Sequence, residues 1–283
     1  MKLQILCVGL LLAVWPPSRG VALEVPAGDL AKIQQAAPGE APAKAARPRR
    51  LLVFTLAKGF VHEATPWGVA ALRCIGEKSG AYTVVASAAP EVFERESLAR
   101  FDAVCFLNTC FTPFTNAVLR QNLMDFVKGG KGYVGIHCAA HTFLDWPEFG
   151  QLQGAYSVNH PWHEKVTVAV EEPEHPLMRC FGGKSFVVAD EIYQFDQCYS
   201  RQRLRVLARL DTRRTDMTKP GITRTDGDFG LVWIQRFGQG RAFYSAFGHD
   251  KEIFWEPTIL RHYLAGIQFA CGDLAAEATP QPR

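Results

Sequence analysis

The sequence lacks the compact patterns that usually mark metal sites, disulfide frameworks and nucleic-acid-binding modules. It contains no Cys-x-x-Cys knuckle and no His-Glu-x-x-His motif. It also lacks a strong excess of basic residues, because 31 Lys and Arg face 28 Asp and Glu, a formal net charge of +3. Since neither a basic excess nor a recognition motif is present, we expect no nucleic-acid partner.

Long apolar runs are also scarce, and the one at the start of the chain is short. Lys2 precedes an apolar run from Leu3 to Trp15, and Gly20-Val21-Ala22 fits a small-x-small cleavage site. This pattern predicts a signal peptide over residues 1–22, and hence an exported protein, periplasmic or extracellular. The run is too short for an ordinary membrane span, so the mature chain should have none; an uncleaved anchor is the alternative.

The composition of the rest of the chain predicts three parts: a linker, one domain and a tail. Residues 23–50 are rich in Ala and Pro and end in basic residues, which predicts a mobile linker with one short helix around Asp29–Gln35. A single α/β domain should cover residues 51–272, and residues 273–283 should form a disordered tail. Removal of the signal peptide would lower the formal net charge from +3 to +1, because Lys2 and Arg19 are lost.

Seven cysteines would remain after cleavage of the signal peptide. Their odd number leaves at least one free thiol unless chains are cross-linked. A pair such as Cys180 with Cys198 is possible in an exported protein, but the spacing does not establish it. Most of the cysteines are expected to be small buried core residues.

The pattern of apolar segments indicates the fold class. Short apolar strands at 50–60, 82–87, 102–108 and 131–137 alternate with helices at 65–78, 91–101 and 116–127. This alternation predicts a parallel sheet covered on both faces. Later strands at 164–171, 186–195 and 204–211, a hairpin at 229–250 and a helix at 257–270 add an antiparallel extension. We therefore expect an α/β protein with a doubly wound, flavodoxin-like, mainly parallel sheet and an antiparallel extension.

Polar residues gather at the predicted ends of these strands, where open α/β sheets bind ligands. The predicted catalytic residues are His137, His249 and Glu191, because imidazole and carboxylate groups suit proton transfer. The predicted substrate-binding residues are His62, Asn108, His160, Tyr193 and Trp162, with His160 and Trp162 in an irregular connection at 157–163. The alternative is that the histidines bond only to neighbouring backbone and the aromatic side chains belong to the core.

The stretch Gly135-Ile136-His137-Cys138-Ala139 has the small residues of a sharp strand-to-helix turn. The middle residue of such a turn projects into the crevice, and here it is His137. Adjacent side chains diverge at a tight turn, so His137 cannot readily activate Cys138 as a nucleophile. We therefore predict that His137 is the functional residue and that Cys138 is not the nucleophile.

A divalent ion such as zinc is a further possibility. His137, His160 and His249 come from three segment ends and are the predicted metal ligands, with Glu191 from a fourth segment. Three imidazoles, or two with a carboxylate, would leave an open coordination position. A histidine cluster can equally bind a sugar by hydrogen bonds without metal, so no cofactor follows with certainty.

Several segments together resemble the ThuA-like family, named for trehalose utilisation. They include "LLVFTLAKGFVHEATPWGVAAL", "GYVGIHCAAHTFLDWPEFGQLQGAY", "NHPW", "DEIYQF" and "GRAFYSAFGHDKEIFWEP", in order between about residues 51 and 271. The resemblance implies a fold like that of class I glutamine amidotransferases, with histidine replacing their cysteine nucleophile, and a role in carbohydrate metabolism. His141 departs from the pattern, since an acidic residue is expected there; it could add a metal ligand.

Three functions follow as hypotheses. The first is an exported enzyme, such as a hydrolase, lyase or isomerase, that processes a small saccharide or keto-sugar derivative by His and Glu acid–base chemistry. The second is a non-catalytic saccharide-binding domain. The third, glutamine amidotransfer, is disfavoured because His137 occupies the turn where those enzymes carry cysteine.

Overall fold

The computed structural model describes residues 24–183, 185–196 and 198–282, so the predicted signal peptide lies outside the described residues. Within these ranges one mixed sheet of nine strands has the order β2-β1-β3-β4-β9-β8-β7-β5-β6. The strands are β1 (Arg50–Phe54), β2 (Thr83–Ser87), β3 (Ala103–Leu107), β4 (Gly132–Ile136), β5 (Ser157–Val170), β6 (Phe186–Phe195), β7 (Arg205–Leu210), β8 (Gly230–Phe237) and β9 (Gly240–Ser245).

The parallel part of the sheet comprises β2, β1, β3, β4 and β9. This order is compatible with the predicted flavodoxin-like arrangement. Alternate residues of β1 enter different cores: Leu51 and Val53 pack in one, Leu52 and Phe54 in the other. Both faces are therefore buried, which explains the continuous apolar runs in the sequence.

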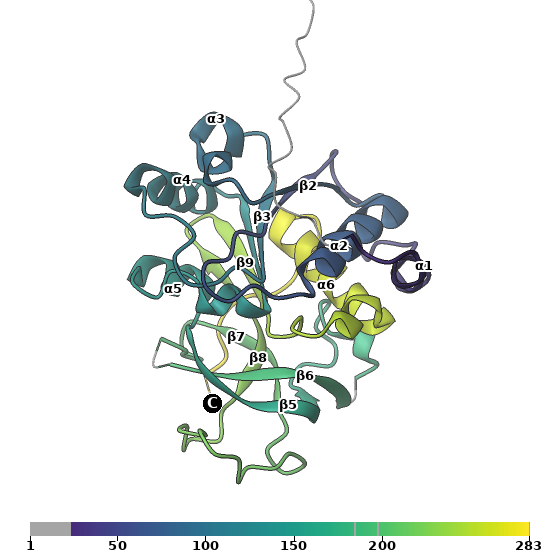
Figure 1. Cartoon of the computed structure of the whole chain (residues 1–283), viewed down its shortest axis with the longest axis vertical. Helices are drawn as coiled ribbons and strands as arrows, with labels where there is room; N and C mark the ends of the chain where they lie inside the picture. The colour runs from purple at the N-terminus through teal and green to yellow at the C-terminus, as the bar shows by residue number, and fades with distance from the viewer. Residues whose placement is uncertain (1–23, 184, 197, 283) are drawn as a thin grey trace, which may run out of the picture.

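Helices cover both faces (Figure 1). One face packs against α2 (Thr65–Ser79) and α6 (Pro257–Cys271), and the other against α4 (Ala117–Lys128) and α5 (Pro147–Gln153). The remaining helices are α1 (Ala27–Ala36), α3 (Arg95–Leu98) and the 3-10 turns η1 (Pro90–Phe93), η2 (His137–His141), η3 (Arg179–Phe181) and η4 (Lys251–Trp255). Asn116 caps α4 by accepting hydrogen bonds from the backbone N–H groups of Val118 and Leu119.

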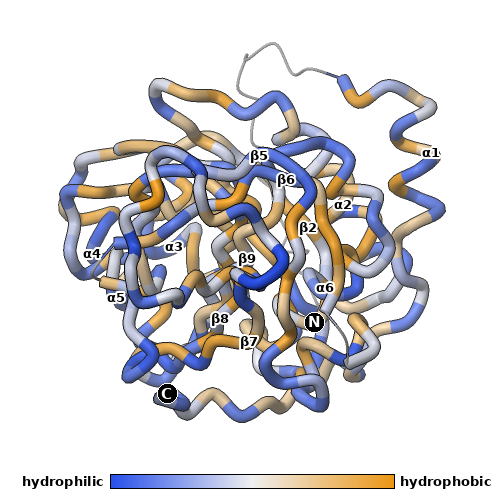
Figure 2. Tube along the Cα trace, turned by 90° about the horizontal axis from the view of Figure 1, so that it is seen from below, coloured by the Kyte–Doolittle hydropathy of each residue, from blue (hydrophilic) through white to orange (hydrophobic). Residues whose placement is uncertain are grey.

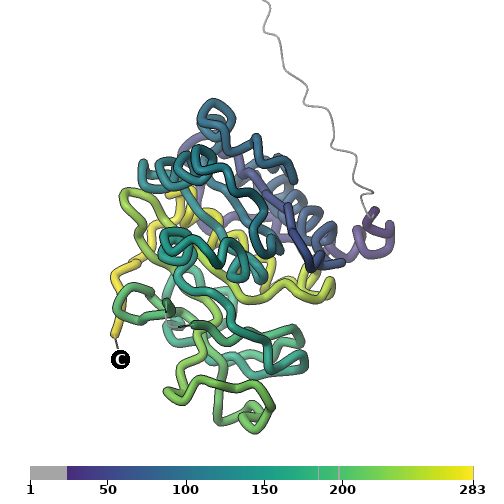
Figure 3. Tube along the Cα trace, turned by 60° about the vertical axis from the view of Figure 1, so that its left-hand side comes forward, coloured from purple at the N-terminus to yellow at the C-terminus, as the bar shows by residue number. Residues whose placement is uncertain are grey.

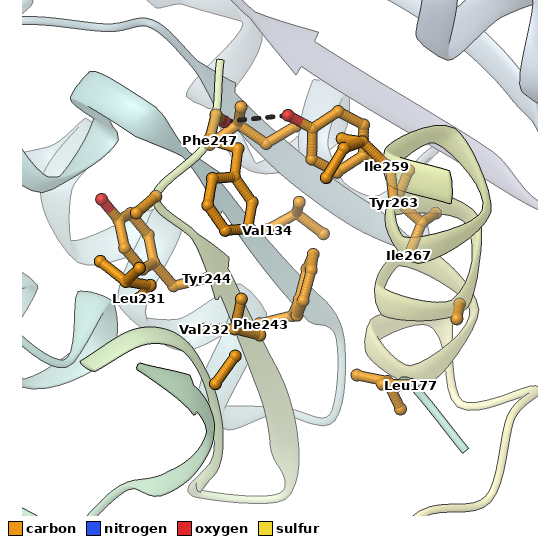
Figure 4. Packing of buried hydrophobic residues seen from close by; sticks show 14 of the residues in the cluster. Val134, Leu177, Leu231, Val232, Phe243, Tyr244, Phe247, Ile259, Tyr263 and Ile267 are labelled. Atoms are coloured by element: carbon orange, nitrogen blue, oxygen red, sulfur yellow. Dashed lines mark hydrogen bonds between the residues drawn. The ribbon is translucent and has the colours of Figure 1, made fainter. Parts of the chain in front are cut away.

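Helix α6 shows how the larger core is built (Figure 4). Its buried face carries Ile259, Tyr263 and Ile267, the residues that the sequence places on one side of this helix. These side chains lie over β4 and β9, and the Tyr263 hydroxyl donates to the Phe247 carbonyl at 2.9 Å. The helix thus anchors the chain just beyond β9, where the candidate site begins.

The antiparallel part comprises β8, β7, β5 and β6, and β8 pairs antiparallel with β9. Residues 157–163 begin β5 and are not an irregular connection as predicted, although the β5–β6 register shifts twice between Ser157 and Trp162. Because proline and several polar residues interrupt the apolar pattern of this segment, the sequence did not indicate a strand here. Figures 1 and 3 show the antiparallel segments gathered at one end of the molecule, and Figure 2 shows hydrophobic stretches in the inner strands.

The segment 24–50 packs against the domain, unlike the mobile linker that its composition predicts. It contains α1, close to the predicted short helix, and Ile33 of α1 is fully buried. Farther along, the Ala43 backbone exchanges two hydrogen bonds with the Gln268 amide. Arg49 pairs with Asp273 at 2.6 Å. A few buried contacts and paired polar groups are therefore enough to fix a segment that is rich in Ala and Pro.

The segment 273–282, predicted to be a disordered tail, also contacts the domain. Arg205 donates to the Thr279 carbonyl at 2.9 Å, and the His175 ring lies 3.0 Å from the Glu277 carbonyl. Ala278 is buried. These contacts lie far apart in the sequence, and no local pattern indicates them.

None of the helices in the described ranges is both long and apolar enough to cross a membrane. The seven described cysteines carry free thiols, so Cys180 and Cys198 are not paired.

Candidate functional site

The candidate site is centred on His137, which follows the last residue of β4. His137 adopts a left-handed backbone (φ 51°), which is uncommon for a residue with a side chain. Glycines make room for this turn: a Cβ added to Gly135 would lie 2.5 Å from the Gln153 side-chain oxygen, and one on Gly248 would lie 3.3 Å from the His137 Cβ. The strained turn and its glycines therefore place the imidazole at the carboxyl ends of the parallel strands.

Hydrogen bonds fix the orientation and tautomer of His137. Its Nδ1 lies 2.8 Å from the Ala246 carbonyl, which can only accept, so Nδ1 carries the proton. Its Nε2 is then free to accept a hydrogen bond from the Tyr193 hydroxyl at 3.0 Å. Burial lowers the pKa of His137 well below its usual value, so the ring is neutral near pH 7.

Glu191 of β6 lies beside three imidazoles. Its Oε1 is 3.4 Å from His249 Nδ1 and 3.6 Å from His137 Nε2, and its Oε2 is 3.1 Å from His160 Nδ1. Burial alone would raise the pKa of Glu191, but the imidazoles, led by His249, lower it to about 2. Glu191 is therefore an anion held within a cluster of histidines.

Curvature of the sheet brings Glu191 to His137. β6 is five strands away from β4 in the sheet order, which would correspond to about 24 Å in a flat sheet. The Glu191–His137 distance of 3.6 Å therefore requires the antiparallel strands to curl back over the carboxyl ends of the parallel strands.

His249 lies in the turn after β9 and differs electrostatically from His137. Burial disfavours the charged ring, yet the Glu191 carboxylate outweighs this cost and raises the pKa of His249. Asp190 holds the turn, because its carboxylate accepts hydrogen bonds from the backbone N–H groups of Gly248, His249 and Asp250 at 2.7–3.1 Å. The role of Asp190 was not predicted; the one sign of it in the sequence is an acidic residue within a largely apolar strand.

His62 joins the cluster from the loop after β1. Its ring centroid lies 5.0 Å from those of His137 and His249. Burial, and next the nearby His249, lower the pKa of His62 to about 4. Its Nδ1 is buried without a hydrogen-bond partner. Because an orphaned buried nitrogen is costly, this atom points to a missing partner in the site.

Four residues of the described chain could together hold a metal ion. One ligand atom from each of His62, His137, Glu191 and His249 lies within 4.8 Å of the others; these residues are the histidine–glutamate cluster. His137, His249 and Glu191 were all expected near the metal, whereas His160 stands outside the cluster and His62, predicted to bind substrate, lies within it. His141, the other possible ligand, instead lies 2.9 Å from the Ser157 hydroxyl.

The other predicted substrate-binding residues occupy different environments. Asn108 is buried, and its side-chain amide donates to the Gly248 carbonyl at 3.0 Å, so it joins the ends of β3 and β9. Tyr193 stacks on His137 with ring centroids 4.6 Å apart, and His160 is 57% exposed at the rim.

Trp162 requires a correction. It is fully buried in the core, and its indole N–H donates to the Asp216 carbonyl at 2.8 Å. Because the ring is enclosed by protein, it cannot stack on a sugar as predicted. Inward strand residues and ligand-facing residues share the same period of two, which is why the sequence could not separate them.

Two adjoining cavities open beside the cluster. One of about 350 Å³ is lined by residues that include Phe60, Phe111, His160, Glu191 and Tyr193. The other, of about 440 Å³, is lined by His62, His249 and neighbouring residues. Both have the size of small-ligand sites. A larger hollow of about 960 Å³ lies between α1 and α6, away from the cluster.

Comparison with known proteins agrees with this architecture. The ThuA family, described as trehalose utilisation, matches residues 50–270. The chain belongs to the ThuA family. Family membership associates this ThuA protein with carbohydrate metabolism, in agreement with the resemblance seen in the sequence. No curated protein matches the chain.

Solved structures share the ThuA fold. A ThuA-like protein of Bacteroides uniformis is 23% identical, with a TM-score of 0.66 over 81% of this chain and 93% of its own. A ThuA-like protein of Parabacteroides merdae is 14% identical, with a TM-score of 0.57 over 83% of this chain and 98% of its own. At these identities the likeness concerns the fold, and the roles of individual residues must be argued from this site.

Proposed function

We propose that this ThuA protein is a sugar-processing enzyme that acts on a small saccharide or a keto-sugar derivative through acid–base chemistry at His137, His249 and Glu191. The observation that carries the proposal is that the pKa values of two neighbouring imidazoles are shifted in opposite directions. The pKa of His137 is lowered by burial, whereas that of His249 is raised by Glu191, and their ring centroids are 5.3 Å apart. Paired groups with opposed pKa shifts are typical of an acid and a base.

Each residue then has a defined role. His249, whose pKa is raised by the nearby Glu191 carboxylate, is the acid that donates a proton to a carbonyl or leaving oxygen. His137 is the base: its Nε2 lone pair accepts the Tyr193 hydroxyl in this structure and would accept a substrate proton when a sugar displaces that contact. A keto-sugar suits this arrangement because its α-protons are acidic enough for a positioned base.

The walls of the adjoining cavity favour a saccharide. Phe60 and Phe111 are exposed at 55% and 43% and offer apolar faces for a sugar ring. His160 also lines this cavity and supplies a polar ring for its hydroxyl groups. We also propose that the protein is exported after removal of residues 1–22, which N-terminal sequencing of the protein secreted by its natural host would test.

Turnover assays test the enzyme proposal. The purified protein is incubated with keto-glucosides and with plain disaccharides, and products are separated chromatographically. Turnover should fall by at least about 100-fold in His137→Gln and in His249→Gln. His262→Gln is the matched control, because His262 is a buried neutral imidazole outside the cluster. Absence of turnover with both substrate sets would refute the proposal.

A saccharide-binding domain is the second candidate, since the same cavity could bind a sugar without proton transfer. Calorimetry separates the two. Sugar binding that persists in His137→Gln and His249→Gln, with no product from the wild-type protein, would favour the binding domain. The orphaned Nδ1 of His62 favours a variant of this site in which the histidine–glutamate cluster holds a divalent ion such as zinc.

A further inference from the structure

Two thiols meet at the floor of the smaller cavity. Cys110 lies beyond β3 and Cys138 follows His137, and their sulfur atoms are 3.3 Å apart. Both cysteines line the cavity of about 350 Å³ beside Glu191 and Tyr193. We propose that Cys110 and Cys138 are a redox-active dithiol that closes to a disulfide by reaction with a small organic disulfide such as oxidised glutathione.

The backbone holds the two cysteines in place. Phe111, next to Cys110, donates its N–H to the His141 carbonyl at 2.8 Å and accepts from the Phe143 N–H at 2.6 Å. The Thr109 and Thr142 hydroxyls lie 2.8 Å apart. These contacts join the segments that carry the two thiols, so each cysteine meets the other without a change in fold. A disulfide requires the sulfurs to approach by about 1.3 Å, to a bond of about 2.05 Å, which is within the range of side-chain rotation.

The chemistry favours Cys110 as the first nucleophile. The Cys138 thiol donates its hydrogen to the Cys110 sulfur, and this hydrogen bond lowers the pKa of Cys110. Cys138, the donor of this hydrogen bond, is then the second thiol, placed to attack the Cys110 sulfur once a mixed disulfide has formed there.

The reaction balances in two exchanges. The Cys110 thiolate attacks one sulfur of oxidised glutathione, forms a mixed disulfide and releases one glutathione thiolate, which takes up a proton. Cys138 then loses its proton and attacks the Cys110 sulfur, which forms the Cys110–Cys138 bond and expels the second glutathione as a thiol. Two protein thiols are oxidised, and one disulfide is reduced to two thiols.

Cys110 and Cys138 are only 2% and 3% exposed, and both line the cavity. A small disulfide would therefore have to enter the cavity to reach them. Once formed, the disulfide would connect the loop after β3 to the His137 turn and so fix the floor of the candidate site. The proposal does not depend on the proposed sugar chemistry, because the bond is detected covalently.

The test uses the full chain in its native state. It is treated with oxidised glutathione, unfolded, alkylated with iodoacetamide and mapped by mass spectrometry. We expect alkylation at two fewer thiols, a peptide pair linked through Cys110 and Cys138, and its loss on treatment with dithiothreitol. Cys198→Ser is the matched control, because Cys198 is exposed, and should retain the link.

Cys110→Ser should leave Cys138 alkylatable, and circular dichroism checks that this variant folds. Full alkylation of wild-type Cys110 and Cys138 after treatment would overturn the proposal. So would glutathione retained on Cys110, or a link from either cysteine to a third one.

Discussion

Replacement of Glu191 by Gln tests the electrostatic basis of the site. The change keeps the size of the side chain but removes the negative charge between His137, His160 and His249. The pKa of Glu191 falls from 4.5 to about 2 in the folded protein, which corresponds to about 3 kcal/mol of favourable interaction for the charged form. Because the folded-state pKa is depressed, this stabilisation is present above about pH 4.5 and is lost as the pH falls towards 2.

We therefore expect Glu191→Gln to lower the free energy of unfolding by up to about 3 kcal/mol at pH 7, and by roughly half as much near pH 3. The pKa of His249 should also fall, because the carboxylate that raises it is gone. Urea unfolding at the two pH values and NMR titration of the imidazoles measure both effects.

Glu77→Gln, on the exposed side of α2, is the control and should change neither quantity. The reasoning fails if His249 titrates identically in Glu191→Gln and the wild-type protein. It also fails if the loss of stability is the same at pH 3 and pH 7.

Three further predictions follow from the same geometry. Turnover should decline as the pH rises through the pKa of His249, which lies above 6.5, because the acid loses its proton; a pH–rate profile without this limb would contradict the role of His249. Gly135→Ala should destabilise the protein by about 1–3 kcal/mol in urea unfolding, since the added Cβ would lie 2.5 Å from the Gln153 oxygen; unchanged stability would show that the turn is loosely packed. If the histidine–glutamate cluster binds zinc, elemental analysis of untagged, zinc-supplemented protein should give about one equivalent, and His62→Ala should reduce it; less than about a tenth of an equivalent would leave the metal-free site.

Local sequence patterns were enough to predict the elements of the parallel half and the tight turn at His137. Continuous apolar runs and helix signals located β2, β3, β4, α2, α4 and α6 to within one residue at each end, whereas β1 ends at Phe54 and not at residue 60 as predicted. Gly135 and the small residues after Cys138 identified a tight turn, and His137 does project from it into the site. These features are local, because apolar period, capping and turn chemistry act over a few residues.

Which polar residues meet in the site depends on how distant segments pack together. The sequence grouped His137, His160, His249 and Glu191, but the curled sheet brings His62 into the cluster and leaves His160 at the rim. The folded structure also buries Trp162 in the core. The physical reason is that contacts between distant segments depend on strand order, sheet curvature and burial. None of these is encoded in the spacing of neighbouring residues, so a histidine at a strand end looks the same in the sequence whether it reaches the centre or the solvent.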